Sequence, residues 1–170
     1  VLCGCSTDIR GIDALLGMIS EYFPSPADMP GQKTESGDVV EADENGPLSA
    51  LVFKTIADPY VGKLSYFRVY SGTLKPDTSV TNSTKGVAEK IGKIFFVTGK
   101  KQTEAGAITA GDMGAVAKLA NTVTGDTLCK QGEKIVYKGI DFPAPNLTLA
   151  ITPAAKGDEE KIGTGLQRLA

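Results

Sequence analysis

Lysine side chains gather at two places in the second half of the chain, where they could bind phosphate groups. Lys85, Lys90 and Lys93 lie close together in the sequence, and the adjacent pair Lys100 and Lys101 follows soon after. On neighbouring strands these side chains could form one basic patch that contacts the phosphates of a nucleic acid, an interaction that is independent of sequence and sensitive to salt. An ordinary solvated face of charged residues is the alternative explanation.

Nucleotide hydrolysis would require a phosphate-binding loop, and the sequence has only an incomplete one. The nearest approach to the pattern G-x-x-x-x-G-K-[ST] begins at Gly86 and ends with Gly92, Lys93 and Ile94. It has one residue too many between the two glycines, and it places an isoleucine where a hydroxyl must bind magnesium. The segment also lies within a run of residues typical of a strand. We therefore predict that the chain alone does not hydrolyse a nucleotide.

The other reactive residue types do not converge on a catalytic or metal site. Histidine, the commonest general base and metal ligand, is absent. Cys3 and Cys5 could share one face of a strand, but a zinc site needs about four ligands and the remaining cysteine, Cys129, is far along the chain. Glu159 and Glu160 are adjacent on an expected helix, so their carboxylates do not meet. We predict no catalytic residue and no metal site, and we expect the cysteines to pack as small hydrophobic residues.

Composition indicates a folded protein rich in strands and turns. The 170 residues are 41% hydrophobic and include 20 glycines and 9 prolines. A net charge of −2 argues against a free-standing nucleic-acid-binding protein, although the average can hide a local basic patch. Three cysteines cannot all pair and no secretory signal precedes them, so a reduced cytoplasmic setting is expected. No apolar run approaches the ~20 residues needed to span a bilayer, and we expect no membrane partner.

A long β-hairpin is predicted in the middle of the chain. Segments 48–56 and 63–70 are rich in the branched and aromatic residues that suit a half-buried pleated surface. Between them, Asp58 and Pro59 favour a bend, and Gly62 can adopt the positive φ that turns the chain back. Because such a pair exposes two edges and one apolar face, the residues that follow must supply more strands.

The following residues do supply strands, which together predict a β domain over 48–141. The expected strands are 78–81, 87–97, 113–119 and 134–137, with turns at 75–77, 84–86, 110–112 and 124–126. Many short strands at this spacing favour a closed or nearly closed antiparallel barrel, since closure removes exposed edges. A β-sandwich is the alternative.

Short α/β segments are expected on both sides of this domain, as pieces of two neighbouring domains. Segment 1–26 is predicted to form a strand at 1–3 and a helix with an apolar stripe. Segment 27–47 is predicted to be a polar, acidic and partly mobile linker. Segment 142–170 is predicted to form a stiff proline-rich joint, a strand at 147–151 and a helix from 158. The helical stripes are formed by Ile12, Leu15, Leu16 and Ile19 and by Ile162, Leu166 and Leu169. Neither piece can bury its apolar face alone, so the chain is expected to be a fragment of a larger protein.

An ordered series of motifs resembles domain II of the elongation factor G family of translational GTPases. The motifs are 51–74 (LVFKTIADPYVGKLSYFRVYSGTL), 82–86 (NSTKG), 110–112 (AGD) and 124–129 (TGDTLC). The flanks extend the resemblance, because 1–26 is similar to the end of that family's GTPase domain and 142–169 to the start of its third domain. The family implies a GTP-driven factor that moves tRNA and mRNA through the ribosome. It also implies that the barrel contacts the GTPase domain and small-subunit ribosomal RNA.

The resemblance also implies where the nucleotide is held. GTP and Mg²⁺ would be bound by the missing part of the GTPase domain, so the intact protein is expected to be a GTPase and the fragment to hold no cofactor. The family's guanine-contacting Gly-Ser-Ala loop falls on Gly4, Cys5 and Ser6, where Cys5 replaces serine and Ser6 replaces alanine. A backbone contact to the base would survive that change, whereas a hydroxyl contact would be weakened.

Two readings compete with ribosomal translocation. Segment 96–106 (FVTGKKQTEAG) is closer to elongation factor G-like paralogues, which favours a non-translocating factor for ribosome protection or recycling. Alternatively, the barrel is a structural spacer that does not contact RNA.

Overall fold

The computed structural model describes residues 1–58 and 61–169, and the chain divides into two compact units, Val1–Pro30 and Gly31–Ala170. The first unit contains the helix α1 (Ile12–Tyr22), which confirms the helix predicted there. The predicted strand at 1–3 is wrong. Cys5 and Arg10 form an isolated bridge instead, because no second strand of the described chain lies beside residues 1–3 to complete a ladder.

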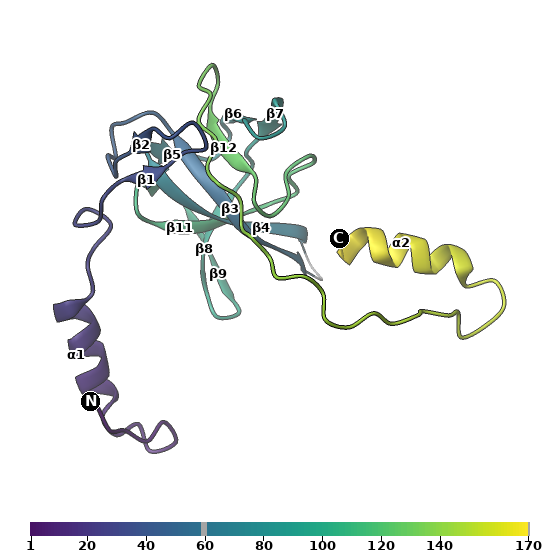
Figure 1. The fold of residues 1–170 in the computed structure, drawn as a ribbon, viewed down its shortest axis with the longest axis horizontal. Coiled ribbons are helices and arrows are strands. Elements are labelled where there is room, and N and C mark those ends of the chain that lie inside the picture. The colour runs from purple at the N-terminus through teal and green to yellow at the C-terminus, as the bar shows by residue number, and fades with distance from the viewer. Residues whose placement is uncertain (59–60, 170) are drawn as a thin grey trace. The chain divides into compact units, whose positions relative to one another are not determined.

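The second unit is built on one large antiparallel sheet with the strand order β7-β6-β12-β3-β4-β11-β8-β9 (Figure 1). Its strands are β3 (Ser49–Asp58), β4 (Gly62–Ser71), β6 (Ser79–Asn82), β7 (Val87–Lys90), β8 (Ile94–Thr98), β9 (Lys101–Ala105), β11 (Met113–Ala117) and β12 (Thr127–Lys130). Two small pairs accompany it, β1 (Gln32–Lys33) with β2 (Val39–Val40) and β5 (Thr73–Leu74) with β10 (Ile108–Thr109), and the helix α2 spans Glu159–Leu169. The predicted mainly β, antiparallel fold is confirmed.

The predicted central hairpin is present as β3 and β4. The two strands pair from Ser49 opposite Ser71 to Asp58 opposite Gly62, with a bulge at Phe53 that leaves this residue without a partner in the register. Gly62 has the expected positive φ of 79°, whereas Pro59 lies outside the described residues. Each strand has ten residues. The hairpin is paired on both sides, with β12 beside β3 and β11 beside β4.

The run 87–97, predicted as one strand, is divided between β7 and β8. Residues 91–93 separate the two: β7 pairs with β6, and β8 pairs with β11 and β9. Ile91 still donates its N–H to the Thr78 carbonyl at 2.8 Å before the chain changes partner. Since β7 forms one end of the sheet and β8 lies near the other, this short connection brings the sheet back on itself. The arrangement is consistent with the predicted barrel.

The core lies between the inner faces of these strands. It consists of Ala50, Val52, Phe67, Val69, Leu74, Val80, Ile91, Ile94, Ala105, Ile108, Val116, Leu119 and Leu128. Glycine is required at position 114, because a Cβ there would lie 2.0 Å from Ile108 Cδ1 and 3.1 Å from the Phe67 ring. Both halves of the sheet therefore share one close-packed interior.

Three other expectations about strands are corrected. Residues 134–136 form no strand, and Tyr137 makes only an isolated bridge to Thr34. The strand after the 124–126 turn is β12, which sequence patterning missed because Thr-Leu-Cys-Lys is short and lacks a clear alternation. Segment 147–151 is also not a strand, since it has no partner in the described chain to accept its hydrogen bonds.

The acidic segment 27–47, predicted as a partly mobile linker, contains the small β1-β2 hairpin and is fixed to the end of β4. Gly72 donates its N–H to the Asp43 carbonyl at 2.7 Å, and Thr73 Oγ1 donates to the Glu44 carbonyl at 3.1 Å. In the part of the chain that the structure describes, no helix has the length and apolar character needed to cross a membrane.

Candidate nucleic-acid interface and nucleotide-binding loop

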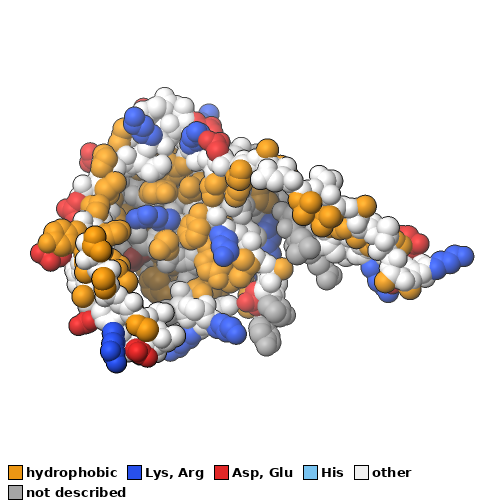
Figure 2. Space-filling view, turned by 60° about the horizontal axis from the view of Figure 1, so that its bottom comes forward, with side chains coloured by type: hydrophobic (Ala, Val, Ile, Leu, Met, Phe, Trp, Pro, Cys, Tyr) orange, Lys and Arg blue, Asp and Glu red, His pale blue; other side chains and the backbone are white. Residues whose placement is uncertain are grey.

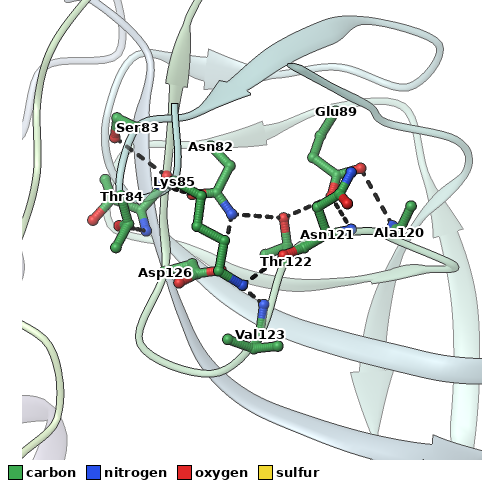
Figure 3. A network of polar contacts seen from close by, with 11 residues as sticks. Asn82, Ser83, Thr84, Lys85, Glu89, Ala120, Asn121, Thr122, Val123 and Asp126 are labelled. Atoms are coloured by element: carbon green, nitrogen blue, oxygen red, sulfur yellow. Dashed lines mark hydrogen bonds and ion pairs between the residues drawn. The ribbon is translucent and has the colours of Figure 1, made fainter. Parts of the chain in front are cut away.

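Lys85, on the turn between β6 and β7, directs its ammonium group toward other residues of the protein (Figure 3). Its Nζ donates to the Asn121 carbonyl at 2.6 Å and lies 3.0 Å from Asp126 Oδ2. The backbone N–H of Lys85 donates to Asn82 Oδ1 at 3.1 Å, and its side chain is only 39% exposed. The structure therefore gives this lysine a structural role that the sequence did not indicate.

Asp126 and Asn82 form the buried centre of this polar network. The Asp126 Oδ2 atom accepts from Asn82 Nδ2 at 2.8 Å and from the Val123 N–H at 2.9 Å, in addition to Lys85. Asn82 Nδ2 also donates to Thr122 Oγ1 at 3.1 Å. Asn82 is 0% and Asp126 4% exposed, so each polar group here depends on its protein partners.

Glu89 extends the same network from β7. Its carboxylate accepts from the Asn121 N–H at 2.6 Å, the Ala120 N–H at 3.3 Å and the Thr122 hydroxyl at 3.0 Å. The network thus connects the loop between β11 and β12 to the β6-β7 hairpin (Figure 3). Sequence analysis did not identify it, because the burial of Glu89, which is 6% exposed, becomes evident only once the strands have paired.

Lys93 also has a carboxylate partner, Glu104, at 2.8 Å. The hydrogen bond from Lys93 to Glu104 and the negative charge of that carboxylate raise the pKa of Lys93 above its usual value. Both side chains are more than half exposed, so this ion pair is weak and could exchange for a phosphate contact.

Lys90, Lys100 and Lys101 are exposed, and none of them forms an ion pair within residues 1–58 and 61–169. Lys90 ends β7, opposite Ser79, whereas Lys100 and Lys101 lie at the turn between β8 and β9. At about 3.3 Å per residue, the length of β8 places that turn more than ~10 Å from Lys93. Four of the five lysines are therefore distributed over the β6-β7 and β8-β9 hairpins, and Lys93 lies on the connection between them. Their contact with RNA stays a prediction.

The predicted guanine-contacting residues lie in a tight loop before α1. Cys5 donates its N–H to the Arg10 carbonyl at 3.0 Å and accepts from the Arg10 N–H at 3.1 Å. Gly4 packs closely here, since a Cβ on it would lie 2.9 Å from the Arg10 oxygen. Ser6 is exposed and makes no hydrogen bond within the described chain.

The Cys5 thiol is also occupied, with its Sγ 3.0 Å from Thr7 Oγ1. The Thr7 hydroxyl, followed by the backbone N–H groups of Asp8 and Thr7, lowers the pKa of the Cys5 thiol. Among the described residues no cluster of three or more Cys, Asp or Glu side chains is arranged to hold a metal ion. The P-loop-like run Gly86 to Ile94 lies along β7 and the start of β8, so it is followed by a strand where a P-loop is followed by a helix.

Comparison with known proteins places these features in a family. A family model for domain 2 of elongation factor G matches residues 47–131, and the whole chain aligns with elongation factor G of Thermotoga maritima at 46% identity over 175 residues. The chain belongs to the elongation factor G family. Elongation factor G of Thermotoga neapolitana is 47% identical over the same length, and the chain spans 25% of each relative.

A solved structure supports the fold of this elongation factor G family member. The crystal structure of a protein from Thermus thermophilus matches it with a TM-score of 0.73 and 30% sequence identity. The match covers 94% of this chain and 22% of that one. The predicted membership of the family is thus confirmed by both sequence and fold.

Proposed function

We propose that the chain is part of an elongation factor G-like translational GTPase of the cytoplasm, and that its β-barrel docks on small-subunit ribosomal RNA during translocation. Family membership over the whole chain is the observation that carries this proposal. The exposed lysines Lys90, Lys100 and Lys101 would contact phosphates, because their charges have no carboxylate partner in the described chain.

The barrel would also relay the nucleotide state between the GTPase domain and domain III of the same protein. GTP and Mg²⁺ would be held by residues of the GTPase domain beyond this chain, and GTP hydrolysis would supply the free energy. Within this chain, Gly4 and Ser6 would position the guanine base, with the Ser6 N–H or hydroxyl as the donor. Cys5 would shape the loop, since its N–H is already bonded to Arg10.

Docking is tested by pelleting small ribosomal subunits with the chain at increasing salt. Changing Lys90, Lys100 and Lys101 together to Glu should reduce binding by about tenfold or more and flatten its dependence on salt, because fewer counterions are released. The matched control changes Lys33, Lys134 and Lys156 to Glu, three exposed lysines that do not belong to β6, β7, β8 or β9. It alters net charge equally and should bind like the unchanged chain.

Lys85 is left unchanged in this experiment, because replacing it would disturb the Asp126 network and confuse misfolding with lost docking. Equal binding by the triple variant and the unchanged chain would reject RNA docking through these lysines and favour the structural-spacer alternative.

A non-translocating paralogue is the second candidate, favoured by segment 96–106, which contains Lys100 and Lys101. The intact protein decides between the two, since a translocase advances tRNA and mRNA on ribosomes in a GTP-dependent assay. A paralogue for protection or recycling would bind the ribosome without advancing them.

A further inference from the structure

A pocket of about 190 Å³ opens on the face of the sheet opposite to the core. It is lined by Leu51 and Phe53 of β3, Arg68 and Tyr70 of β4, and Met113 of β11. The register explains the grouping, because Arg68 pairs with both Leu51 and Met113 and so places three side chains in one row across three strands. The neighbouring β4 residues Phe67 and Val69 point the other way, into the core. We call this site the Arg68 pocket.

The Arg68 pocket combines exposed apolar walls with an incompletely satisfied cation. Met113 is 57% exposed although it is a large hydrophobic residue. Arg68 Nε is shielded from solvent and has no hydrogen-bond partner, and Arg68 forms no ion pair within the described residues. Its guanidinium carbon lies 5.7 Å from the centre of the Tyr70 ring, which holds the group in place. A buried donor without an acceptor is rare in folded proteins, so the Arg68 guanidinium is not fully satisfied by the described residues.

The position of Arg68 is itself well fixed. Tyr70 contacts the buried Tyr137 ring with 4.9 Å between centroids, and Tyr137 is hydrogen-bonded to Ser49 at 2.7 Å. The other two buried side-chain atoms without partners, Thr55 Oγ1 and Ser65 Oγ, belong to residues that pair with each other and do not line the pocket. The unmet donor in the pocket is therefore a local property of Arg68.

The chemistry of the lining indicates what the pocket accepts. A guanidinium presents parallel N–H donors that match the two oxygens of a carboxylate. The walls are otherwise apolar or aromatic, and Arg68 is the one charge among the five lining residues. A nucleic-acid backbone is better matched by several cations spaced along a groove. Figure 2 shows that hydrophobic side chains surround a hollow on one face of the molecule, with single basic side chains among them.

We propose that the Arg68 pocket is a docking site for a polypeptide segment that presents an Asp or Glu carboxylate beside an apolar side chain. The carboxylate accepts from the two terminal guanidinium nitrogens of Arg68, while the apolar side chain contacts Phe53 and Met113. This site is separate from the proposed RNA contact and does not depend on it.

The test uses the ¹⁵N-labelled 170-residue chain and the capped tripeptide acetyl-Leu-Glu-Leu-amide, with acetyl-Leu-Gln-Leu-amide as the matched probe without charge. The Glu peptide should shift the Arg68 Nε–H resonance and the Met113 methyl resonance, with a Kd on the order of 1 mM, as fits so small a ligand. The Gln peptide should bind at least about tenfold more weakly. Equal binding of the two peptides, or no shift at about 10 mM, would overturn the proposal.

Variants locate the binding and protect the test against misfolding. Arg68→Lys keeps the charge but loses the two terminal guanidinium nitrogens and should weaken the Glu peptide about tenfold, whereas Arg10→Lys, an exposed arginine outside the barrel, should have no effect. Met113→Ala changes an exposed side chain, so the fold should persist while peptide affinity falls about threefold or more. If a short oligouridine shifts Arg68 Nε–H more strongly than the Glu peptide, the site binds nucleic acid and the proposal fails.

Discussion

Lys85 differs from the other candidate lysines because its carboxylate partner, Asp126, is buried. Asp126 accepts three hydrogen bonds or ion pairs at 4% exposure, so its removal leaves Lys85, Asn82 and the Val123 N–H without their acceptor. Asp126→Ala should therefore lower the free energy of unfolding by about 3 kcal/mol. Lys85→Met should cost only about 1 kcal/mol, since that side chain is partly solvated.

Urea denaturation measures both changes, with Lys90→Met as the control at an exposed lysine, expected to stay within about 0.5 kcal/mol of the unchanged chain. A cost for Asp126→Ala as small as that of the control would show that the network does not support the barrel.

Tyr137 gives the barrel a pH dependence at the alkaline end. Burial raises the pKa of Tyr137 to about 12, against the opposing effect of its hydrogen bond with Ser49. In the unfolded chain the phenol ionises near its ordinary value of ~10, so above that pH the unfolded state binds fewer protons than the folded state. Stability should then fall between about pH 10 and pH 12, by up to about 3 kcal/mol.

Ultraviolet absorbance of the phenolate should show one tyrosine that ionises only near pH 12, and this late step should be missing in Tyr137→Phe. A Tyr137→Phe chain that loses stability over the same alkaline range as the unchanged chain would contradict this assignment.

At the scale of elements, the features that depend on residues adjacent in the chain were predicted correctly. The β3-β4 hairpin was predictable because two long β-rich runs flank a turn at Asp58 and Gly62. Strands that depend on distant partners were less predictable: β12 is short but buried between β3 and β6, whereas 147–151 alternates well and has no partner in the described chain. Membership in a ladder is decided by neighbours far along the chain, which the pattern of a single segment does not contain.

The residues of the candidate sites could be predicted from the sequence, but the contacts that they make could not. The sequence located every lysine but not the acceptor of each one, because Lys85 meets Asp126 and Lys93 meets Glu104 only after the strands have paired. The Arg68 pocket was not predicted for the same reason, because it depends on the pairing that places Leu51, Arg68 and Met113 in one row across three strands. In the loop before α1, the resemblance supplied Gly4, Cys5 and Ser6, and the structure showed that the Cys5 N–H is already bonded.

At the scale of the whole molecule, the two compact units should differ in their dependence on the rest of the chain. Every member of the core cluster comes from Gly31–Ala170, and α1 contains no buried residue. The apolar stripe of α1 is open, with Leu15, Leu16 and Ile19 between 39% and 60% exposed. A helix of 11 residues without a buried residue is marginal in water, so we expect Val1–Pro30 to be poorly folded as an isolated peptide.

Removing residues 1–30 should therefore leave the free energy of unfolding of the remaining chain, measured with urea, unchanged within about 0.5 kcal/mol, because no core residue is lost. A synthetic peptide of residues 1–30 should show little helical circular dichroism, since the open stripe gives its helix no packing energy. Circular dichroism of the two pieces checks both expectations against the intact chain. A truncated chain destabilised by more than about 1 kcal/mol, or a strongly helical peptide, would mean that the stripe of α1 is buried or that the helix is stable by itself. Agreement would mean that Gly31–Ala170 folds as a unit whose stability does not depend on residues 1–30.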